Sequence, residues 1–363
     1  DITPASKLKS ELGRKIDWMV GLFNQKKAAA AYHKTQVSKT GKLDVNKINE
    51  WCMTDDLFLK SEIVKDDRNH GFVMFIDWSS SMYGNIAGTV KQLFILSEFC
   101  VKTNIPFEVY LYTDFSSCNM NTNKKFSNDD VHALPDNKIM YKVLSSDMKQ
   151  TKRLEQYSAM LECKIPMGGT PMSAAAYISE YIIRNFKTKT KCEKVSMILV
   201  SDGMGSAAFG YSTKIHFFDK ESGKNYTLRY NYQYFDFWKY IKQKYNLHAL
   251  VGFYVTEFKT LIDIQKSMVP LYPNYTKLDA QTYAKARESG FISFKHDCFD
   301  MFGMVDISNF KVKSVEDINS LTGQANQFSS MLVKEKKVDD FFEQISKSNG
   351  KMLFLNKFIE IIS

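Results

Sequence analysis

The sequence predicts an α/β protein built on a doubly wound, mostly parallel sheet with helices on both faces. Apolar strand patterns at residues 71–76, 107–113, 195–201 and 248–255 alternate with helical patterns at 86–103, 153–162, 170–186 and 235–245. Such alternation is typical of parallel strands joined by helical crossovers. The strands are apolar along their length, which indicates burial on both faces of the sheet.

The chain is long enough for one large or two modest domains. It has 363 residues, of which 44% are hydrophobic and 14% aromatic, so it can bury a sizeable core. We expect three parts: a helical N-terminal extension over 1–65, the α/β core over 66–260, and an α/β C-terminal extension over 261–363 that packs on the core. Within the first part, residues 8–32 carry helical apolar spacing, and Asp44 is a candidate cap for a short helix at 45–51.

Two insertions interrupt the alternation. Residues 115–150 are polar and irregular, and we expect a long excursion containing a hairpin there. Residues 205–234 are rich in Phe and Tyr, and a Glu-Ser-Gly-Lys turn at 221–224 predicts a second hairpin beside the carboxyl edge of the sheet. This second hairpin is either a specificity element or simply packing. After residue 255 we expect helices at 278–289, 315–345 and 352–362, and strands at 291–294 and 305–312.

Three short segments, far apart in sequence, predict one metal site. They contribute two carboxylates and three hydroxyls, from Asp77, Ser79, Ser81, Thr170 and Asp202. The first and last segments follow buried strands, and Thr170 stands where a helix begins, so all of them fall at the carboxyl edge where α/β sheets bind ligands. Hard oxygen ligands of this kind suit Mg2+, with Mn2+ or Ca2+ as alternatives.

The serine turn has a simpler interpretation, in which the run 79–81 only caps the helix at 86–103. That interpretation leaves Thr170 and Asp202 without a role. Ser79 and Ser81 are two residues apart on a turn, so both hydroxyls can face one point while Ser80 faces away. Trp78, inside the same loop, either packs beneath it or stands at its rim as an aromatic contact for a partner.

The motif Asp77-x-Ser79-x-Ser81, followed by Thr170 and Asp202, resembles the metal-ion-dependent adhesion site of von Willebrand factor A (VWA) domains. The resemblance spans residues 71–256 and implies a VWA, Rossmann-like fold. It implies that Ser79, Ser81 and Thr170 bind the ion directly or through water, while Asp77 and Asp202 hold it mostly through water. One coordination position would remain for a partner's Glu or Asp.

Upstream of this region, Gly41-Lys-Leu-Asp44 and the short helix after it resemble the corresponding segment of CobT-type cobaltochelatase accessory subunits, and similar VWA proteins occur in tailed phages. The resemblance implies a non-catalytic accessory subunit whose partner is an AAA+ ATPase of the MoxR/CobS kind. Two other functions stay open. One is a structural or assembly component, for example of a phage particle, in which the metal only stabilises the fold. The other is RNA binding, as in Ro-type proteins.

Composition excludes several classes of function. No apolar stretch approaches the roughly 20 residues that span a bilayer, so we expect no membrane segment. The net charge of +9 favours acidic partners, but the basic runs lack the interleaved aromatics of a single-strand nucleic-acid groove. There is no phosphate-binding P-loop, and the six histidines are dispersed, so we expect no catalytic site. Six cysteines without a C-x-x-C pair indicate free thiols and a cytoplasmic location, either in a host cell or in a virion.

Overall fold

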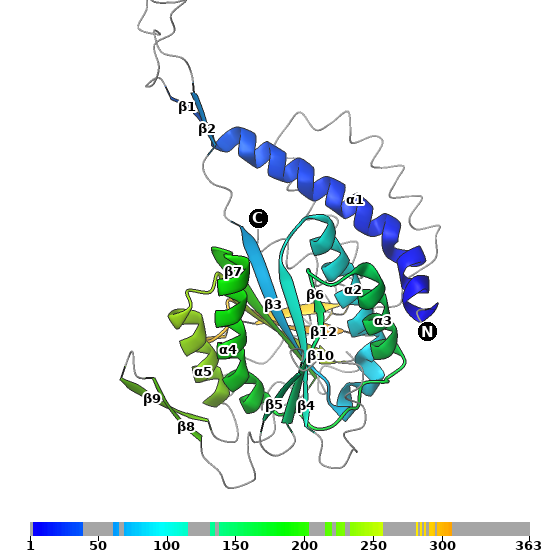
Figure 1. The fold of residues 1–363 in the computed structure, drawn as a ribbon, viewed down its shortest axis with the longest axis vertical. Helices are drawn as coiled ribbons and strands as arrows, with labels where there is room; N and C mark the ends of the chain where they lie inside the picture. Colours follow the sequence, from blue (N-terminus) through cyan, green and yellow to red (C-terminus); the bar gives the residue numbers. More distant parts are fainter. Residues whose placement is uncertain are drawn as a thin grey trace, which may run out of the picture.

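The core of the protein is an eight-stranded sheet in the order β11-β12-β10-β7-β3-β4-β6-β5 (Figure 1). The computed structural model describes residues 3–38, 61–64, 69–114, 131–134, 138–202, 215–219, 223–228, 233–256, 290–294 and 296–306, and the single residues 281, 284 and 287. The strands of the sheet are β3 (His70–Asp77), β4 (Phe107–Asp114), β5 (Val131–Leu134), β6 (Lys138–Ser145), β7 (Lys194–Ser201), β10 (Ala249–Thr256), β11 (Phe291–Phe294) and β12 (Met301–Asp306).

The sheet is doubly wound about its central strand, β3. Strands β4, β3, β7, β10 and β12 are parallel, whereas β5, β6 and β11 pair in antiparallel fashion at the two edges. The chain leaves β3 toward β4 and later returns to place β7 on the other side of β3. The order of the strands therefore reverses at β3 and β7, and ligands of α/β sheets bind in the crevice at such a point. The predicted fold class is confirmed.

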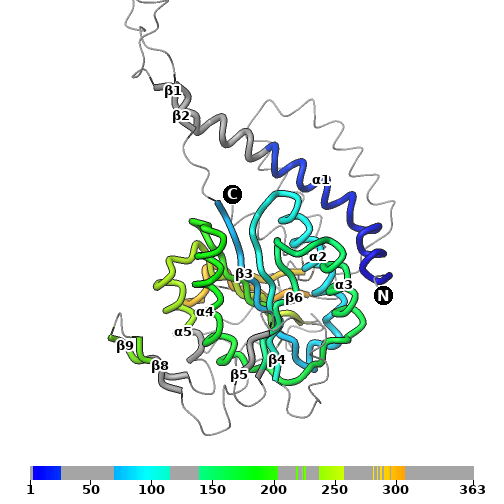
Figure 2. The backbone as a smooth tube through the Cα atoms, in the orientation of Figure 1, coloured from blue at the N-terminus to red at the C-terminus, as the bar shows by residue number. Residues whose placement is uncertain are grey.

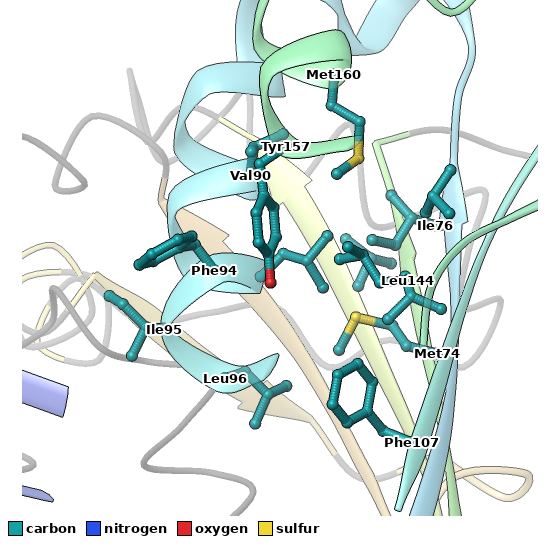
Figure 3. Packing of buried hydrophobic residues seen from close by; sticks show 14 of the residues in the cluster. Met74, Ile76, Val90, Phe94, Ile95, Leu96, Phe107, Leu144, Tyr157 and Met160 are labelled. Carbon is teal, nitrogen blue, oxygen red and sulfur yellow. The ribbon is translucent and has the colours of Figure 1, made fainter. Parts of the chain in front are cut away.

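Helices cover both faces of the sheet (Figures 1 and 2). One face packs against α2 (Ile86–Lys102) and α3 (Gln150–Leu161), and the other packs against α4 (Met172–Thr190) and α5 (Gln233–Lys244). Successive residues of β3 point to opposite faces of the sheet. Met74 packs in the first core, under α2 and α3, and Phe75 packs in the second core, under α4 and α5. Figure 3 shows the first core, where Met74, Ile76, Phe107 and Leu144 of the sheet lie opposite Val90, Tyr157 and Met160 of the helices.

A long N-terminal helix, α1 (Thr3–Lys34), packs on α2 and α3 and confirms the helix predicted at 8–32. Its buried residues recur every three or four positions and form one stripe: Ala5, Leu8, Leu12, Ile16 and Met19. Phe23 meets Phe99 of α2 edge to face, and Asp17 pairs with Lys102. After α1 comes a two-stranded antiparallel pair, β1 (Thr35–Ser38) with β2 (Ser61–Val64). The helix expected at 45–51 lies outside the described residues.

Both predicted hairpins are present in the described residues. Strands β5 and β6 form the hairpin expected within 115–150, and β6 extends the sheet beside β4. Strands β8 (Ile215–Asp219) and β9 (Lys224–Leu228) form the hairpin expected within 205–234. Each core strand and helix predicted from the sequence is found, with its ends shifted by no more than about one helical turn.

The C-terminal part is described only in places. Strand β11 lies where it was predicted, and residues 281, 284 and 287 of the helix predicted at 278–289 are helical. The strand predicted at 305–312 was placed too late, because β12 begins at Met301 and pairs with β10. Gly303 weakens the strand pattern there, and its missing side chain makes room for the Phe291 ring. The helices predicted at 315–345 and 352–362 lie outside the described residues, and the boundaries predicted at 65 and 260 stay predictions.

None of the described helices combines the length and the apolar character needed to cross a bilayer. The described cysteines, Cys100, Cys163, Cys192 and Cys298, are free thiols, as predicted.

The interface between α2 and α3 contains a buried ion pair. Arg153 donates from Nε to Glu98 Oε1 at 2.9 Å and from a second nitrogen to Glu98 Oε2 at 3.2 Å. Its remaining contact is with the carbonyl oxygen of Met148, at 2.6 Å. Arg153 is only 5% exposed, so this arginine lies in the core although the turn that leads to it, at 149–153, is basic. Breaking such a pair leaves a buried charge without compensation.

Arg153→Met should therefore destabilise the protein by about 3–5 kcal/mol in urea unfolding, because Glu98 stays buried without its partner. The double variant Glu98→Leu/Arg153→Met should recover most of that loss, since it removes both charges. Lys149→Met, at an exposed position, is the matched control and should change stability by no more than about 0.5 kcal/mol. A loss below that level for Arg153→Met would contradict the assigned role of the pair.

Candidate metal centre

The carboxyl ends of β3 and β7 bring two of the predicted residues together. Asp77 is the last residue of β3 and is fully buried, and Ser201, the last residue of β7, donates from Oγ to Asp77 Oδ2 at 2.7 Å. The next residue along the chain is Asp202. Parallel pairing of β3 with β7 runs from His70 opposite Lys194 to Ile76 opposite Val200, so it places these strand ends side by side.

The serine turn joins this strand end through its hydroxyls. Ser79 Oγ and Ser81 Oγ lie 2.9 Å apart, and Ser81 Oγ donates to Asp202 Oδ1 at 2.9 Å. Since the Ser81 hydroxyl donates to Asp202, the Ser79 hydroxyl donates to Ser81. Ser80 is exposed and takes no part in this network through its side chain. The turn continues as a short 3-10 helix, η2 (Ser80–Asn85), on which Tyr83 is 70% exposed.

The interpretation of the serine run as a helix cap is wrong. Ser79 precedes η2 without making a side-chain capping bond, and α2 is preceded by Asn85, which makes none either. The serine hydroxyls instead bond to each other and to Asp202. Trp78 is 1% exposed and donates from Nε1 to the carbonyl oxygen of Ile165 at 3.0 Å, so it packs beneath the loop and does not stand at the rim.

The backbone places Thr170 beside the same turn. Gly168 pairs with Ser79 in a parallel bridge, and Ser80 N–H donates to the carbonyl oxygen of Gly168 at 2.8 Å. Thr170 follows two residues later, just before α4. The structure thus links Ser79, Ser81 and Asp202 through hydrogen bonds, and it ties Asp77 to Ser201, the residue before Asp202. It also brings the segment that carries Thr170 against the serine turn. Their role as metal ligands stays a prediction.

Burial dominates the electrostatics of Asp77. Removal from water raises the pKa of its carboxyl to about 7, against an ordinary value of 3.8. The Ser201 hydrogen bond and the nearby Ser79 lower this pKa, while the charge of Asp202 raises it further. Burial also raises the pKa of Asp202, against the hydrogen bond from Ser81. Burial thus disfavours the ionised forms of both carboxyls, and a cation bound beside them would favour those ionised forms.

The donor set fits a hard divalent ion. Asp77 Oδ1 is buried and has no hydrogen-bond partner of ordinary geometry among the described residues. Buried polar atoms in folded proteins are generally satisfied by a partner, so Asp77 Oδ1 is suited to bind a water molecule or an ion. Every side chain in the set offers oxygen, which Mg2+, Mn2+ and Ca2+ prefer. The described residues contain no group of three or more His, Cys, Asp or Glu suited to a metal, so the candidate centre depends on its hydroxyls.

The histidines with described side chains lie away from this edge or have local partners. His70, at the start of β3, and His248, just before β10, contact each other edge to face at the amino edge of the sheet. His296 Nδ1 accepts the N–H of Cys298 at 3.0 Å, and burial lowers the pKa of its ring. Asp300 pairs with Lys242 and accepts the N–H of Leu250. These groups support the local fold.

The prediction from sequence missed the carboxylate of Asp114, which lies beside the segment that carries Thr170. It ends β4, the other neighbour of β3, and its Oδ1 accepts the N–H of Gly169 at 2.7 Å. A signal was available, because an Asp directly after the apolar pattern 107–113 obeys the same rule that located Asp77.

Comparison with known proteins gave structural neighbours only. No family model and no curated protein matches the chain. The pilus adhesin SpaC of Lactobacillus rhamnosus GG is similar at 15% identity and a TM-score of 0.35, over 56% of this chain and 26% of that chain. The vWF domain of the type V pili tip protein Mfa5 of Porphyromonas gingivalis is similar at 16% identity and a TM-score of 0.24, over 39% and 40%.

A third neighbour is the manganese-loaded TRAP protein of Plasmodium vivax, at 12% identity and a TM-score of 0.31, over 67% of this chain and 70% of that chain. This chain thus spans well under half the length of the SpaC and Mfa5 chains that it matches. At these identities and TM-scores the neighbours assign no function, and the assignment of the metal centre rests on the geometry of this chain.

The raised pKa of Asp77 predicts how the metal-free protein responds to pH. Because the folded-state pKa of about 7 exceeds the ordinary 3.8, folding favours the protonated carboxyl. Stability in EDTA should therefore fall as pH rises from about 4 to about 7 and then level off, as urea unfolding at a series of pH values would show. Asp77→Asn cannot ionise and should lose much less stability over that range.

Added Mg2+ should act in the opposite direction, because the ion requires the ionised carboxylate. Its stabilising effect should be larger at pH 8 than at pH 5. Equal pH dependence of the wild type and Asp77→Asn in EDTA would count against a strongly buried, proton-binding Asp77.

Proposed function

We propose that this chain is a metal-dependent protein-interaction module of the VWA type. Its divalent ion, for which Mg2+ is the first candidate, binds a carboxylate of a partner protein. One observation carries the proposal. The buried, half-satisfied Asp77 carboxylate lies at the end of the central strand, and beside it a hydrogen-bonded chain of hydroxyls runs from Ser79 through Ser81 to Asp202.

The residues that would hold the ion are Asp77, Ser79, Ser81, Thr170 and Asp202. Asp77 is fully buried and Ser79 is 2% exposed, so these two form the floor of the site. Ser81 is exposed and Asp202 is half-buried, so the set is open to solvent on one side. A partner can therefore approach the ion without rearrangement of the strands.

A bound divalent cation would supply positive charge that neutralises the two acids and attracts the partner's carboxylate. Such a contact is charge-assisted and stronger than a surface salt bridge between side chains. The chain's own groups orient the site. Ser201 fixes one oxygen of Asp77, and Ser81 fixes one oxygen of Asp202. Asp77 keeps its other oxygen, Oδ1, for the ion or for its water ligands.

The partner in this proposal is an AAA+ ATPase of the MoxR/CobS kind, with this chain as its non-catalytic accessory subunit in the cytoplasm or, for a phage protein, in the virion. The support for this finer part is the sequence resemblance of residues 41–51 to the segment upstream of the VWA domain in CobT-type subunits. We do not extend chelatase activity to the chain.

The serine turn offers a matched pair of variants that tests the metal centre. Ser81→Ala removes a hydroxyl of the network and should weaken Mg2+ binding at least about tenfold in isothermal titration calorimetry. Ser80→Ala changes an exposed neighbour outside the network and should bind Mg2+ like the wild type. Asp77→Ala should abolish Mg2+ binding while the protein stays folded.

A pull-down measures whether an AAA+ ATPase of the MoxR/CobS kind, used as bait, captures the wild type and the same variants. It is carried out once in Mg2+ and once in EDTA. The proposal expects capture in Mg2+ that is lost in EDTA and in Asp77→Ala. If capture persists undiminished in chelator, the interaction does not use the ion. Mg2+ binding that stabilises the fold without any capture would support the alternative of a structural component.

A further inference from the structure

The segment that carries Thr170 is held on one side by a residue outside the predicted metal set. Asp114 lies at the carboxyl end of β4, two residues beyond Tyr112, where the pairing of β4 with β3 ends and Trp78 N–H donates to the carbonyl oxygen of Tyr112 at 2.9 Å. Asp114 forms an antiparallel bridge with Gly169, and its Oδ1 accepts the N–H of Gly169 at 2.7 Å.

The contact between Asp114 and the two glycines leaves no room for a side chain. A Cβ added at Gly168 would lie 1.5 Å from the carbonyl oxygen of Asp114, and a Cβ at Gly169 would lie 2.8 Å from each of its carboxylate oxygens. Glycine is the residue that permits such a close approach of backbone to backbone. The dipeptide 168–169 therefore lies directly on Asp114.

The opposite side of the same dipeptide faces the serine turn. The carbonyl oxygen of Gly168 accepts the N–H of Ser80 at 2.8 Å, while the N–H of Gly169 points to Asp114. One peptide unit is thus held between β4 and the serine turn, and Thr170 is the next residue along the chain. Any movement of this unit moves Thr170 relative to Ser79 and Ser81.

We propose that Asp114 is the positioning residue of the metal centre: its carboxylate fixes the dipeptide 168–169 and thereby holds Thr170 at the ion. This inference rests on the proposed function. Asp114 acts here as a hydrogen-bond acceptor and does not itself bind the ion. A charge-assisted bond from a backbone N–H is short and strong enough to order a loop in this way.

The alanine and asparagine variants of Asp114 separate a positioning role from a direct one. Asp114→Ala removes the acceptor and should lower Mg2+ affinity about 10- to 100-fold, the usual effect of losing a residue that supports a metal ligand. Asp114→Asn keeps an oxygen that can accept the N–H of Gly169 and should restore the affinity to within a few-fold of the wild type. Calorimetric titration with Mg2+ measures both.

Amide hydrogen exchange provides a readout that needs no metal. In EDTA, the amide of Gly169 should exchange slowly in the wild type and in Asp114→Asn, and much faster in Asp114→Ala. Asp147→Ala is the matched control, because Asp147 is an exposed acid in the turn at the other end of β4 and should change neither exchange nor affinity. Thermal unfolding in EDTA verifies that each variant is folded.

The outcomes distinguish this inference from the proposed function. If the wild type binds Mg2+ and Asp114→Ala binds it equally well, the inference is overturned and the proposed function stands. If Asp114→Asn is as weak as Asp114→Ala although the Gly169 amide stays protected, Asp114 acts through its charge as a ligand, which also overturns the inference. If the wild type binds no Mg2+, the proposed function itself fails, and the inference fails with it.

Discussion

The parallel pairing of β3 with β7 is the interaction on which the rest of the structure depends. It joins segments 124 residues apart, as the bond between Ser201 and Asp77 shows. It thereby places Asp77, at the end of β3, beside Ser201 at the end of β7 and Asp202 directly after it. The same pairing buries the alternating residues of β3 in two separate cores. Because β4 occupies the other side of β3, any side chain at the end of these three strands is held within one small area.

Placing an acid at the end of a fully buried strand works against stability in the absence of a cation. Burial disfavours the charge on Asp77, and one of its oxygens lacks a partner of ordinary geometry among the described residues. The neighbouring Trp78 is buried and donates to the carbonyl oxygen of Ile165, and apolar residues of the strands fill the core on both faces of the sheet. A local cost of this kind is common where a fold retains a group for binding.

Much of the fold was predictable, because each core strand is a short apolar run and each core helix shows apolar residues at helical spacing. The hydroxyls and acids at the strand ends were predictable too, since strand ends of a parallel sheet share an edge. Three features were not. The ion pair of Arg153 depends on where α3 packs, and the early start of β12 depends on its pairing with β10. The strand-end position of Asp114 follows from the sequence, but its bond to the N–H of Gly169 depends on where the segment 168–169 lies. Each is set by tertiary contacts that no local pattern encodes.

The residues of the serine turn have different roles, because the side chain of Ser80 is exposed and those of Ser79 and Ser81 bond to each other. The backbone N–H of Ser80 ties the turn to Gly168, and its neighbours on either side supply the hydroxyls of the network, but its own side chain is free of both tasks. Tyr83, further along the same turn, is likewise turned outward. Substitutions at these two positions can change the shape and chemistry of the rim while the inner oxygens stay in place. Affinity for the ion and choice of partner can therefore evolve independently on a single loop.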